Sequence, residues 1–553
     1  RPYFKRLETL SGIWFWDART GEPPRALMDW FSPRDLTARL EQKLDPAALA
    51  KTDRQLGVTG LRDYQVEAIH AVEAAIASGQ RRLLIAMATG TGKTRLAIAL
   101  MYELLRAQRF RRILFLVDRK ALGIQTLDSM SNTETASLLK FDKIFPIAGM
   151  DKAIPDLEDR VQVSTVQAMI RRLFDNPDGQ HPTPGSYDLI IVDEAHRGYV
   201  LDAELRDDDL GFRNLDDYLS AYRRVLDYFD ATQIALTATP ALHTREIFGA
   251  PVFHYSYRQA VIAGHLIDHR PPRRITTALS QTGIHFDAGE EVAVVDSRTN
   301  QVDLFDLEDE VDFEVAEFNK KVHTEAFNRA VATAVALECP PDKPGKTLIF
   351  AARDTHADIL VKALRQALTE EYGPQPHDMV EKITGEVDRP NERIKVFRSD
   401  PRPKYVVTVD LLTTGIDIPS IVNLVFVRRV NSRILYDQMI GRATRRCDEI
   451  GKEYFRIFDA VDIYANLQTV TDMKPVVVNP SLSFTTLLGD LNRATTDEDR
   501  VWVRDQIVVK LRQRVRHIAP EYAAPLEAVL GPLTDLPDQL RDAPPSAMAD
   551  LFA

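Results

Sequence analysis

Apolar residues in this chain gather into short β-rich runs that alternate with helical patterns. Five runs come first and five more follow after an interruption. The first set is Arg82–Ala88, Arg112–Asp118, Val161–Thr165, Tyr187–Asp193 and Ala231–Thr237; the second is Lys346–Ala352, Val380–Thr384, Lys404–Asp410, Val422–Val427 and Glu453–Asp459. Such alternation is typical of parallel sheets flanked by helices. The pattern predicts an α/β fold with two parallel-sheet domains in tandem.

Helical patterns between these runs complete the predicted organisation. Examples are Glu325–Leu337, Thr355–Ala367 and Ser432–Arg442. We expect a leader over 1–55, a first domain over 56–255 and a second domain over 256–465. Residues 466–553 turn helical and Pro-rich, so we expect a helical C-terminal region there.

Composition narrows the class of protein. The chain has 553 residues, which is too long for a single core. It has only two cysteines, Cys339 and Cys447, which fits a reducing compartment. No apolar run is long enough to cross a bilayer, and no signal peptide is visible. We therefore expect a cytoplasmic protein with no membrane partner. The first residue is Arg1 rather than Met, so we also expect a fragment.

The net charge of −11 argues against a nucleic-acid binder only if the charge is evenly spread. It is not, because Asp287–Glu317 holds 12 carboxylates and one basic residue, Arg298. We expect this acidic insertion, at about 280–320, to lie away from any phosphate backbone. A local positive surface elsewhere would still allow nucleic acid to bind.

A glycine-rich loop follows the first apolar run. Residues 87–94 read Met-Ala-Thr-Gly-Thr-Gly-Lys-Thr and lead into a helical stretch. A strand, a glycine loop and a helix start direct backbone N–H groups at bound phosphate. The strict phosphate-loop pattern would place Gly at position 87, where this chain has Met87.

The loop predicts ATP and Mg²⁺ as cofactors. Lys93 supplies a positive charge for the β- and γ-phosphates, and Thr94 offers a hydroxyl to Mg²⁺. Gly90 and Gly92 let the backbone approach phosphate closely. The expected nucleotide contacts in the loop are Thr89, Gly90, Thr91, Gly92, Lys93 and Thr94.

A pair of carboxylates ends the fourth apolar run. Asp193 and Glu194 follow Val192 directly. Ligands of α/β sheets bind at the carboxyl ends of the strands, so we expect this pair beside the phosphate loop. Asp193 is suited to hold Mg²⁺, and Glu194 to deprotonate the attacking water. After the fifth run, the hydroxyls of Leu236–Pro240 are placed to bond this acidic turn.

Two arginines in the second domain match the chemistry of a γ-phosphate. Arg442 and Arg445 are three residues apart, so on a helix end they would face the same way. Guanidinium groups stabilise charge that develops on a transferred phosphoryl group. We expect both to act on ATP when the two domains close.

Taken in order along the chain, these motifs resemble those of superfamily-2 helicases. The motifs are Leu61–Gln65, the phosphate loop, Asp193–His196, Leu236–Pro240, Thr413–Pro419 and Gln438–Arg445. The resemblance covers roughly residues 56–465 and implies two RecA-like domains with ATP between them.

The resemblance also assigns residues to the nucleotide site. It implies that Arg62 and Gln65 read adenine. It implies that Asp417 couples the second domain to the nucleotide, near Thr414 and Gly415. His196 and Gln438 belong to the same matched motifs and are expected in this site.

A narrower likeness points to the motor subunits of type I restriction–modification enzymes. It rests on Asp193–Tyr199, Tyr255–Val261, Gly264–Asp268, Val409–Asp417 and Gln438–Cys447. This likeness implies an ATP-driven translocase of double-stranded DNA that joins methyltransferase and specificity subunits. The family match also implies nucleic-acid contacts at Arg119, Ser164, Thr165, Gln167, Arg353 and Thr413.

The leader departs from this family pattern. A nuclease of the family needs carboxylates and a lysine on separate strands, whereas Asp35–Leu44 reads as an amphipathic helix. DNA cleavage by this chain is therefore not supported, and we expect a nuclease domain before Arg1 unless this homologue lacks one. Two other readings stay open: another superfamily-2 DNA or RNA helicase, and a scaffold that binds ATP without turnover.

Overall fold

The protein is described by a computed structural model, in which two compact units divide the chain: Arg1–Ser256 and Tyr257–Ala553. The residues that the structure describes are 14–16, 24–27, 30–41, 57–135, 137–175, 181–195, 215–240, 242–275, 284–286, 291–295, 302–306, 311–313, 325–412, 417–430, 432–515 and 517–545.

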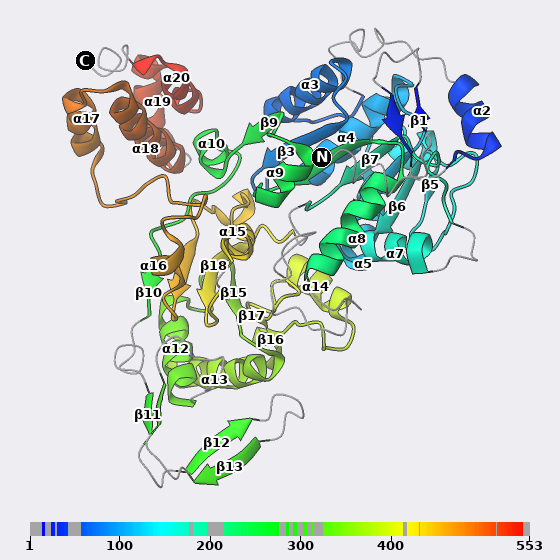
Figure 1. The fold of residues 1–553 in the computed structure, drawn as a ribbon. Helices are drawn as coiled ribbons and strands as arrows, with labels where there is room; N and C mark the ends of the chain where they lie inside the picture. Colours follow the sequence, from blue (N-terminus) through cyan, green and yellow to red (C-terminus); the bar gives the residue numbers. More distant parts are fainter. Residues whose placement is uncertain are drawn as a thin grey trace. The chain divides into compact units, whose positions relative to one another are not determined.

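A seven-stranded parallel sheet forms the centre of the first unit (Figure 1). In spatial order its strands are β5 (Ile147–Ala148), β6 (Val161–Thr165), β4 (Ile113–Val117), β7 (Leu189–Val192), β8 (Thr232–Thr237), β3 (Arg82–Met87) and β9 (Phe253–Tyr255). The central strands are almost wholly buried, as parallel strands covered on both faces must be. This burial explains why they appear in the sequence as continuous apolar runs.

Helices cover both faces of this sheet. They are α3 (Asp63–Ala77), α4 (Lys93–Arg106), α5 (Lys120–Asn132), α6 (Phe141–Ile144), α7 (Val166–Ile170), α8 (Leu215–Tyr228) and α9 (Leu242–Phe248), with a π-helical turn at Arg171–Asp175. Leu114, Ile190 and Ala235 point from the strands into one core with Met169 of α7 and Val225 of α8. Helix α3 contacts β3 and β9, and α5 contacts β4 and β6.

The leader is bound to the first unit through its helix α2 (Pro33–Glu41), which follows the short strands β1 (Trp14–Phe15) and β2 (Arg25–Ala26). Arg39 of α2 donates to the carboxylate of Asp230 at 2.8 Å and to its carbonyl oxygen at 2.9 Å. Arg81 donates to the other oxygen of the same carboxylate at 3.0 Å. Asp230 is almost fully buried, so two guanidinium groups balance one desolvated charge.

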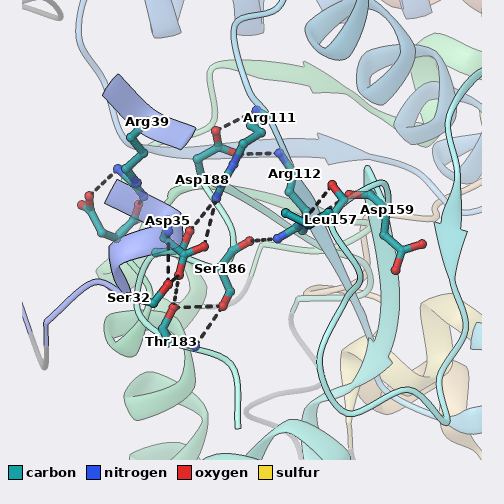
Figure 2. A network of polar contacts seen from close by, with 12 residues as sticks. Ser32, Asp35, Arg39, Arg111, Arg112, Leu157, Asp159, Thr183, Ser186 and Asp188 are labelled. Carbon is teal, nitrogen blue, oxygen red and sulfur yellow. Dashed lines mark hydrogen bonds and ion pairs between the residues drawn. The ribbon is translucent and has the colours of Figure 1, made fainter. Parts of the chain in front are cut away.

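Asp35 of the same helix takes part in a second polar cluster (Figure 2). Its carboxylate accepts hydrogen bonds from Ser32 and Thr183 and forms an ion pair with Arg111 at 3.5 Å. Burial raises the pKa of Asp35, but these hydrogen bonds and the charges of Arg111 and Arg112 outweigh it, so the pKa lies below its ordinary value. Asp35 therefore has a structural role. This agrees with the expectation that its segment forms a helix and not the strands of a nuclease.

Both clusters lie where the strands begin. Asp188 precedes β7 and accepts from the backbone N–H groups of Arg111 and Arg112, which precede β4, at 2.7 and 2.9 Å. Asp230 precedes β8 in the same way. The leader helix is thus fixed at the amino-terminal edge of the sheet, opposite the edge where the phosphate loop follows β3.

The second unit contains a six-stranded parallel sheet. Its order is β10 (Arg273–Arg274), β19 (Arg456–Asp459), β18 (Ile421–Phe426), β15 (Lys346–Phe350), β17 (Tyr405–Thr408) and β16 (Val380–Lys382). Its helices are α10 (Tyr257–Ile262), α12 (Glu325–Glu338), α13 (Asp354–Tyr372), α14 (Pro390–Ser399), α15 (Arg433–Ile440) and α16 (Ile463–Leu467). The predicted fold class, two parallel-sheet α/β domains, is confirmed.

The C-terminal region is helical, as predicted. It consists of α17 (Phe484–Arg493), α18 (Asp497–Val515), α19 (Pro520–Leu530) and α20 (Leu536–Asp542). Helix α18 contacts α17, α20 and α10. Arg258 of α10 forms an ion pair with Asp505 of α18 at 2.9 Å, which ties this region to the start of the second unit.

The acidic insertion contains paired strands. β11 (Ile284–Phe286) pairs antiparallel with β14 (Val311–Phe313), and β12 (Glu291–Val295) pairs antiparallel with β13 (Val302–Asp306). Across the described part of the chain, we find no helix with the length and apolar character that crossing a membrane requires.

Candidate functional site

The phosphate loop takes the conformation that its glycines allow. Gly90 and Gly92 have φ of 87° and 84°, values that L side chains rarely adopt. Thr91 closes the turn by donating from Oγ1 to the Ala88 carbonyl at 2.7 Å. Helix α4 then begins at Lys93, so its first backbone N–H groups and its positive dipole end lie at the loop. This is the arrangement that binds phosphate groups.

Lys93 lies beside the acidic turn Asp193–Glu194, which follows β7 and is about a hundred residues away in the chain. Its side-chain nitrogen is 3.4 Å from the Met87 carbonyl oxygen and 4.0 Å from Oε1 of Glu194. The sheet order β7-β8-β3 produces this approach, because the ends of β3 and β7 are separated by one strand only. The structure therefore brings together the loop and the carboxylates that the sequence assigned to one site.

The acidic turn itself is tightly held. Asp193 donates its backbone N–H to the Leu116 carbonyl at 2.9 Å, and its Oδ1 accepts from the backbone N–H of Glu194 at 2.9 Å. Ala195 donates its backbone N–H to the Leu236 carbonyl at 2.9 Å. Glu194 has a φ of 49°, a left-handed conformation that costs energy for a residue with a side chain. Such strain clusters at functional sites.

The charges of this site favour a cation. Burial, with the neighbouring Glu194 adding to its effect, raises the pKa of Asp193 to about 7, and Lys93 opposes both. When both carboxylates are ionised, one ammonium group faces two of them, which leaves an excess of negative charge in this half-buried place. A divalent cation would offset that excess, and carboxylate and hydroxyl oxygens are the ligands that Mg²⁺ prefers. The assignment of Asp193 and Thr94 to this role stays a prediction.

The Thr-rich segment at the end of β8 contacts the acidic turn through its backbone. The link is the hydrogen bond from Ala195 to Leu236 described above. Thr237 accepts the backbone N–H of Thr239 on its Oγ1 at 3.2 Å, and both side chains are buried. The hydroxyl of Thr237 therefore shapes its own turn.

Two side chains of α3 hold the phosphate loop from behind. Gln65 donates from Nε2 to the Gly92 carbonyl at 3.1 Å and accepts the backbone N–H of Arg62 at 3.0 Å. Tyr64 donates its hydroxyl to the Thr91 carbonyl at 2.7 Å. A Cβ at Gly92 would approach Gln65 Nε2 to 2.9 Å, so this glycine also makes room for the amide.

Tyr64 and Tyr255 are members of the site that the sequence did not single out. Their rings stack at 4.1 Å with an interplanar angle of 10°. Tyr255 ends β9, next to β3, and Ala88 donates its backbone N–H to the Tyr255 carbonyl at 2.9 Å. The only signal in the sequence was that Tyr64 lies in the motif Leu61–Gln65 and Tyr255 in the motif Tyr255–Val261. The assignment of Arg62 and Gln65 to adenine stays a prediction.

In the second unit, the two arginines do not lie on a helix end as expected. Helix α15 ends at Ile440, so Arg442 and Arg445 follow it in a turn and the helical spacing argument was wrong. Gly441 is the C-terminal capping residue of this helix. Arg442 is buried and donates from Nε to the Gln438 carbonyl at 3.2 Å.

Arg445 and Asp417, which the sequence placed in separate motifs, meet in the structure. Arg445 Nε lies 2.9 Å from Asp417 Oδ1. Burial lowers the pKa of Arg445, and Asp417 opposes that shift. Gln438 is buried on α15 beside Asp437. The second unit thus brings Asp417, Gln438, Arg442 and Arg445 into one region.

The predicted site residues His196, Thr413 and Gly415 lie outside the described residues, and so does Thr414. The remaining nucleic-acid candidates differ in exposure. Arg119 and Gln167 are partly exposed, Arg353 is exposed before α13, and Ser164 is fully buried. Thr165 caps α7 by accepting the Ala168 N–H at 3.1 Å. Ser164 accepts from the Arg172 guanidinium at 3.4 Å, so its hydroxyl already has a partner.

Family models match three stretches of the chain. Residues 59–242 match the family described as "Type III restriction enzyme, res subunit". Residues 331–447 match "Helicase conserved C-terminal domain". Residues 1–40 match "Type I restriction enzyme EcoKI endonuclease subunit second domain". The first two matches contain the phosphate loop, the acidic turn and residues Arg442–Arg445, called the arginine segment below, and they imply the use of a nucleotide.

Individual relatives extend the similarity. The chain is 46% identical over 90% of its length to the type I restriction enzyme EcoKI endonuclease subunit of Escherichia coli strain K12. It is 29% identical over 80% of its length to the EcoAI endonuclease subunit of Escherichia coli. It covers 43% and 52% of these two proteins, so the chain spans about half the length of the curated relatives that it matches.

A solved structure shares the fold. A fragment described as an HsdR subunit of a type I restriction enzyme from Vibrio vulnificus YJ016 matches with a TM-score of 0.54. The match covers 82% of this chain and 75% of that chain at 24% sequence identity, so it bears on the fold alone.

Proposed function

We propose that this chain is the motor part of a type I restriction endonuclease subunit, because it matches two helicase-type family models and is similar to such a subunit over most of its own length. In this role it hydrolyses ATP and translocates double-stranded DNA. The single observation that carries the proposal is the approach of Lys93 to Glu194 at 4.0 Å, beside a phosphate loop and across one strand.

The residues of the first unit suit ATP hydrolysis. The loop N–H groups and Lys93 bind the phosphates, and Glu194 accepts a proton from the attacking water. Asp193 and Thr94 would hold Mg²⁺, which would supply positive charge to the phosphate oxygens. Tyr64 and Gln65 keep the loop in its binding conformation, since both donate to its carbonyl groups.

Arg442 and Arg445 complete the proposed reaction from the second unit. A guanidinium group near a transferred phosphoryl group is worth about 10³–10⁵ in rate. We assign them to the γ-phosphate in a closed state reached during turnover. The ion pair between Arg445 and Asp417 keeps one of the two guanidinium groups ordered before that state forms.

The partners follow from the same proposal. Double-stranded DNA is the track, and methyltransferase and specificity subunits complete the complex. We propose that Arg119, Gln167 and Arg353 contact the phosphate backbone, since each has an accessible side chain. Buried Ser164 and capping Thr165 would need to exchange their present partners to do so.

A comparison of polymers tests the function. ATP hydrolysis by the purified chain is measured with no nucleic acid and with double-stranded DNA, single-stranded DNA or RNA. We expect double-stranded DNA to stimulate most, and Lys93→Ala to abolish hydrolysis while circular dichroism stays unchanged. Stimulation by RNA or single strands alone would favour another helicase. ATP binding without hydrolysis in any condition would favour a scaffold.

A further inference from the structure

We propose that Lys452 is a positioning residue for the arginine segment, because its side chain ties the segment that holds Arg445 to the segment that holds Asp417. The inference rests on the proposed function, since it concerns how the arginines are held for ATP hydrolysis. It adds a residue that lies outside every motif matched above and that touches neither the nucleotide nor the reacting atoms.

The contacts of Lys452 are specific to these two segments. Its Nζ donates to the Pro419 carbonyl at 2.9 Å and to the Ala443 carbonyl at 2.7 Å. Pro419 lies two residues after Asp417, and Ala443 lies between Arg442 and Arg445. One ammonium group therefore links the backbone of both segments at the position where their side chains form the ion pair.

Lys452 reaches these carbonyls from a well-anchored turn. A 3-10 helix, Asp448–Ile450, ends at Gly451, which has a φ of 59°. The backbone N–H of Lys452 then donates to the Cys447 carbonyl at 3.1 Å. The backbone of Lys452 is thus held in place. Its Nζ can therefore hold the carbonyls of Pro419 and Ala443 at defined positions.

Burial makes this link important for its partners. Lys452 is only 4% exposed, and desolvation lowers its pKa to about 7. Both the charged and the neutral amine carry at least two N–H groups, so both carbonyls can be satisfied in either form. Removing the amine leaves two carbonyls without that donor in a place that water reaches poorly, and such groups relax by moving.

The ion pair between Arg445 and Asp417 connects the two segments more weakly than the buried Lys452 does. Side-chain exposures are 43% for Asp417 and 23% for Arg445, so solvent screens their attraction. On its other side, the arginine segment is held by the Ile267 N–H, which donates to the Thr444 carbonyl at 2.7 Å. Among the described contacts, the buried side chain of Lys452 therefore connects the backbone at Ala443 to the segment that holds Asp417.

The test compares Lys452→Met with a matched buried lysine. Lys346 also donates from Nζ to two carbonyls, those of Phe397 and Asp400, and is 6% exposed, but these Nζ contacts lie outside both motif segments. Steady-state ATP hydrolysis with double-stranded DNA is measured for the whole chain. We expect Lys452→Met to lower kcat at least tenfold with KM for ATP within about threefold. Lys346→Met should keep kcat near wild type.

A double-mutant cycle separates positioning from general damage. If Lys452 acts through Arg445, adding Lys452→Met to Arg445→Ala should lower kcat by less than twofold further. Full additivity, or equal losses in Lys346→Met and Lys452→Met, would overturn the inference. If Lys452→Met does not fold, Lys452→Gln keeps an NH₂ donor and enters the same cycle; we expect a smaller loss, and full additivity would again overturn the inference. A wild-type chain without ATP hydrolysis would instead refute the proposed function itself.

Discussion

The side-chain nitrogen of Lys93 lies 4.0 Å from Oε1 of Glu194, although the two residues follow different strands of the sheet. This distance is too long for a strong hydrogen bond, and it leaves Lys93 able to turn toward a phosphate. Glu194 has an unusual backbone conformation, with a φ of 49°. The pair therefore places a cation that can bind phosphate beside a carboxylate that can accept a proton, and hydrolysis of a triphosphate needs both groups.

Glu194→Gln should separate ATP binding from ATP hydrolysis. Gln keeps the size of the side chain but cannot accept the proton of water at neutral pH. We expect the affinity for ATP to stay within a few-fold and the hydrolysis rate to fall at least about a hundredfold, in line with general-base magnitudes of 10²–10⁴. Binding of a fluorescent ATP analogue and release of phosphate measure the two quantities. A loss of affinity with normal turnover per bound ATP would assign Glu194 to binding.

Arg442→Ala should lower the hydrolysis rate at least about a hundredfold, an order set by arginine-finger magnitudes. Arg442 is almost buried, so the melting temperature is measured alongside the rate. Arg493→Ala is the control, because Arg493 is 83% exposed at the end of α17 and pairs only with its helix neighbour Asp490 among the described contacts. A near-wild-type rate in Arg442→Ala would show that the second unit does not act on the nucleotide through this residue.

Much of the fold was readable from the sequence because its strands are buried on both faces. Val161–Thr165 was predicted with its observed bounds, and Ala231–Thr237 differs from β8 by one residue. Strands β9 and β10 were missed, since Phe253–Tyr255 and Arg273–Arg274 are short and include polar residues. Edge strands of this kind show no apolar run, so only their pairing partners identify them.

The candidate site was readable wherever its residues are consecutive in the chain. The phosphate loop and the acidic turn each have a local pattern with a chemical reason. Two contacts join segments that are distant in the chain: the stacking of Tyr64 on Tyr255 and the hydrogen bond from Lys452 to Pro419. No local sequence pattern predicts such contacts. The position of Arg442 after α15 was misjudged, although Gly441 carried the signal for a helix end.

Arg39→Ala should destabilise the first unit without changing the chemistry of ATP. The substitution removes two hydrogen bonds to Asp230, one to its buried carboxylate and one to its carbonyl oxygen, while the bond from Arg81 to the carboxylate stays. We expect a loss of about 1–3 kcal/mol in the free energy of unfolding. Urea unfolding measures this loss. The hydrolysis rate of the folded enzyme should be unchanged, since α2 lies at the amino-terminal edge of the sheet, and a large fall in that rate would contradict this placement.

Asp437→Asn should make the second unit less sensitive to pH. Burial raises the pKa of Asp437 to about 7 from 3.8; the hydrogen bond from Thr471 and the charge of Arg433 oppose the shift, and Asp472 adds to it. In the window between these two values, the folded state binds more protons than the unfolded state, so stability falls as pH rises toward 7 and is level above it. At about 1.4 kcal/mol for each pKa unit, the effect is of the order of a few kcal/mol. Asn cannot ionise, so the melting temperature of the variant relative to wild type should be higher at pH 8 than at pH 5. A difference that stays constant across this range would show that Asp437 does not titrate there.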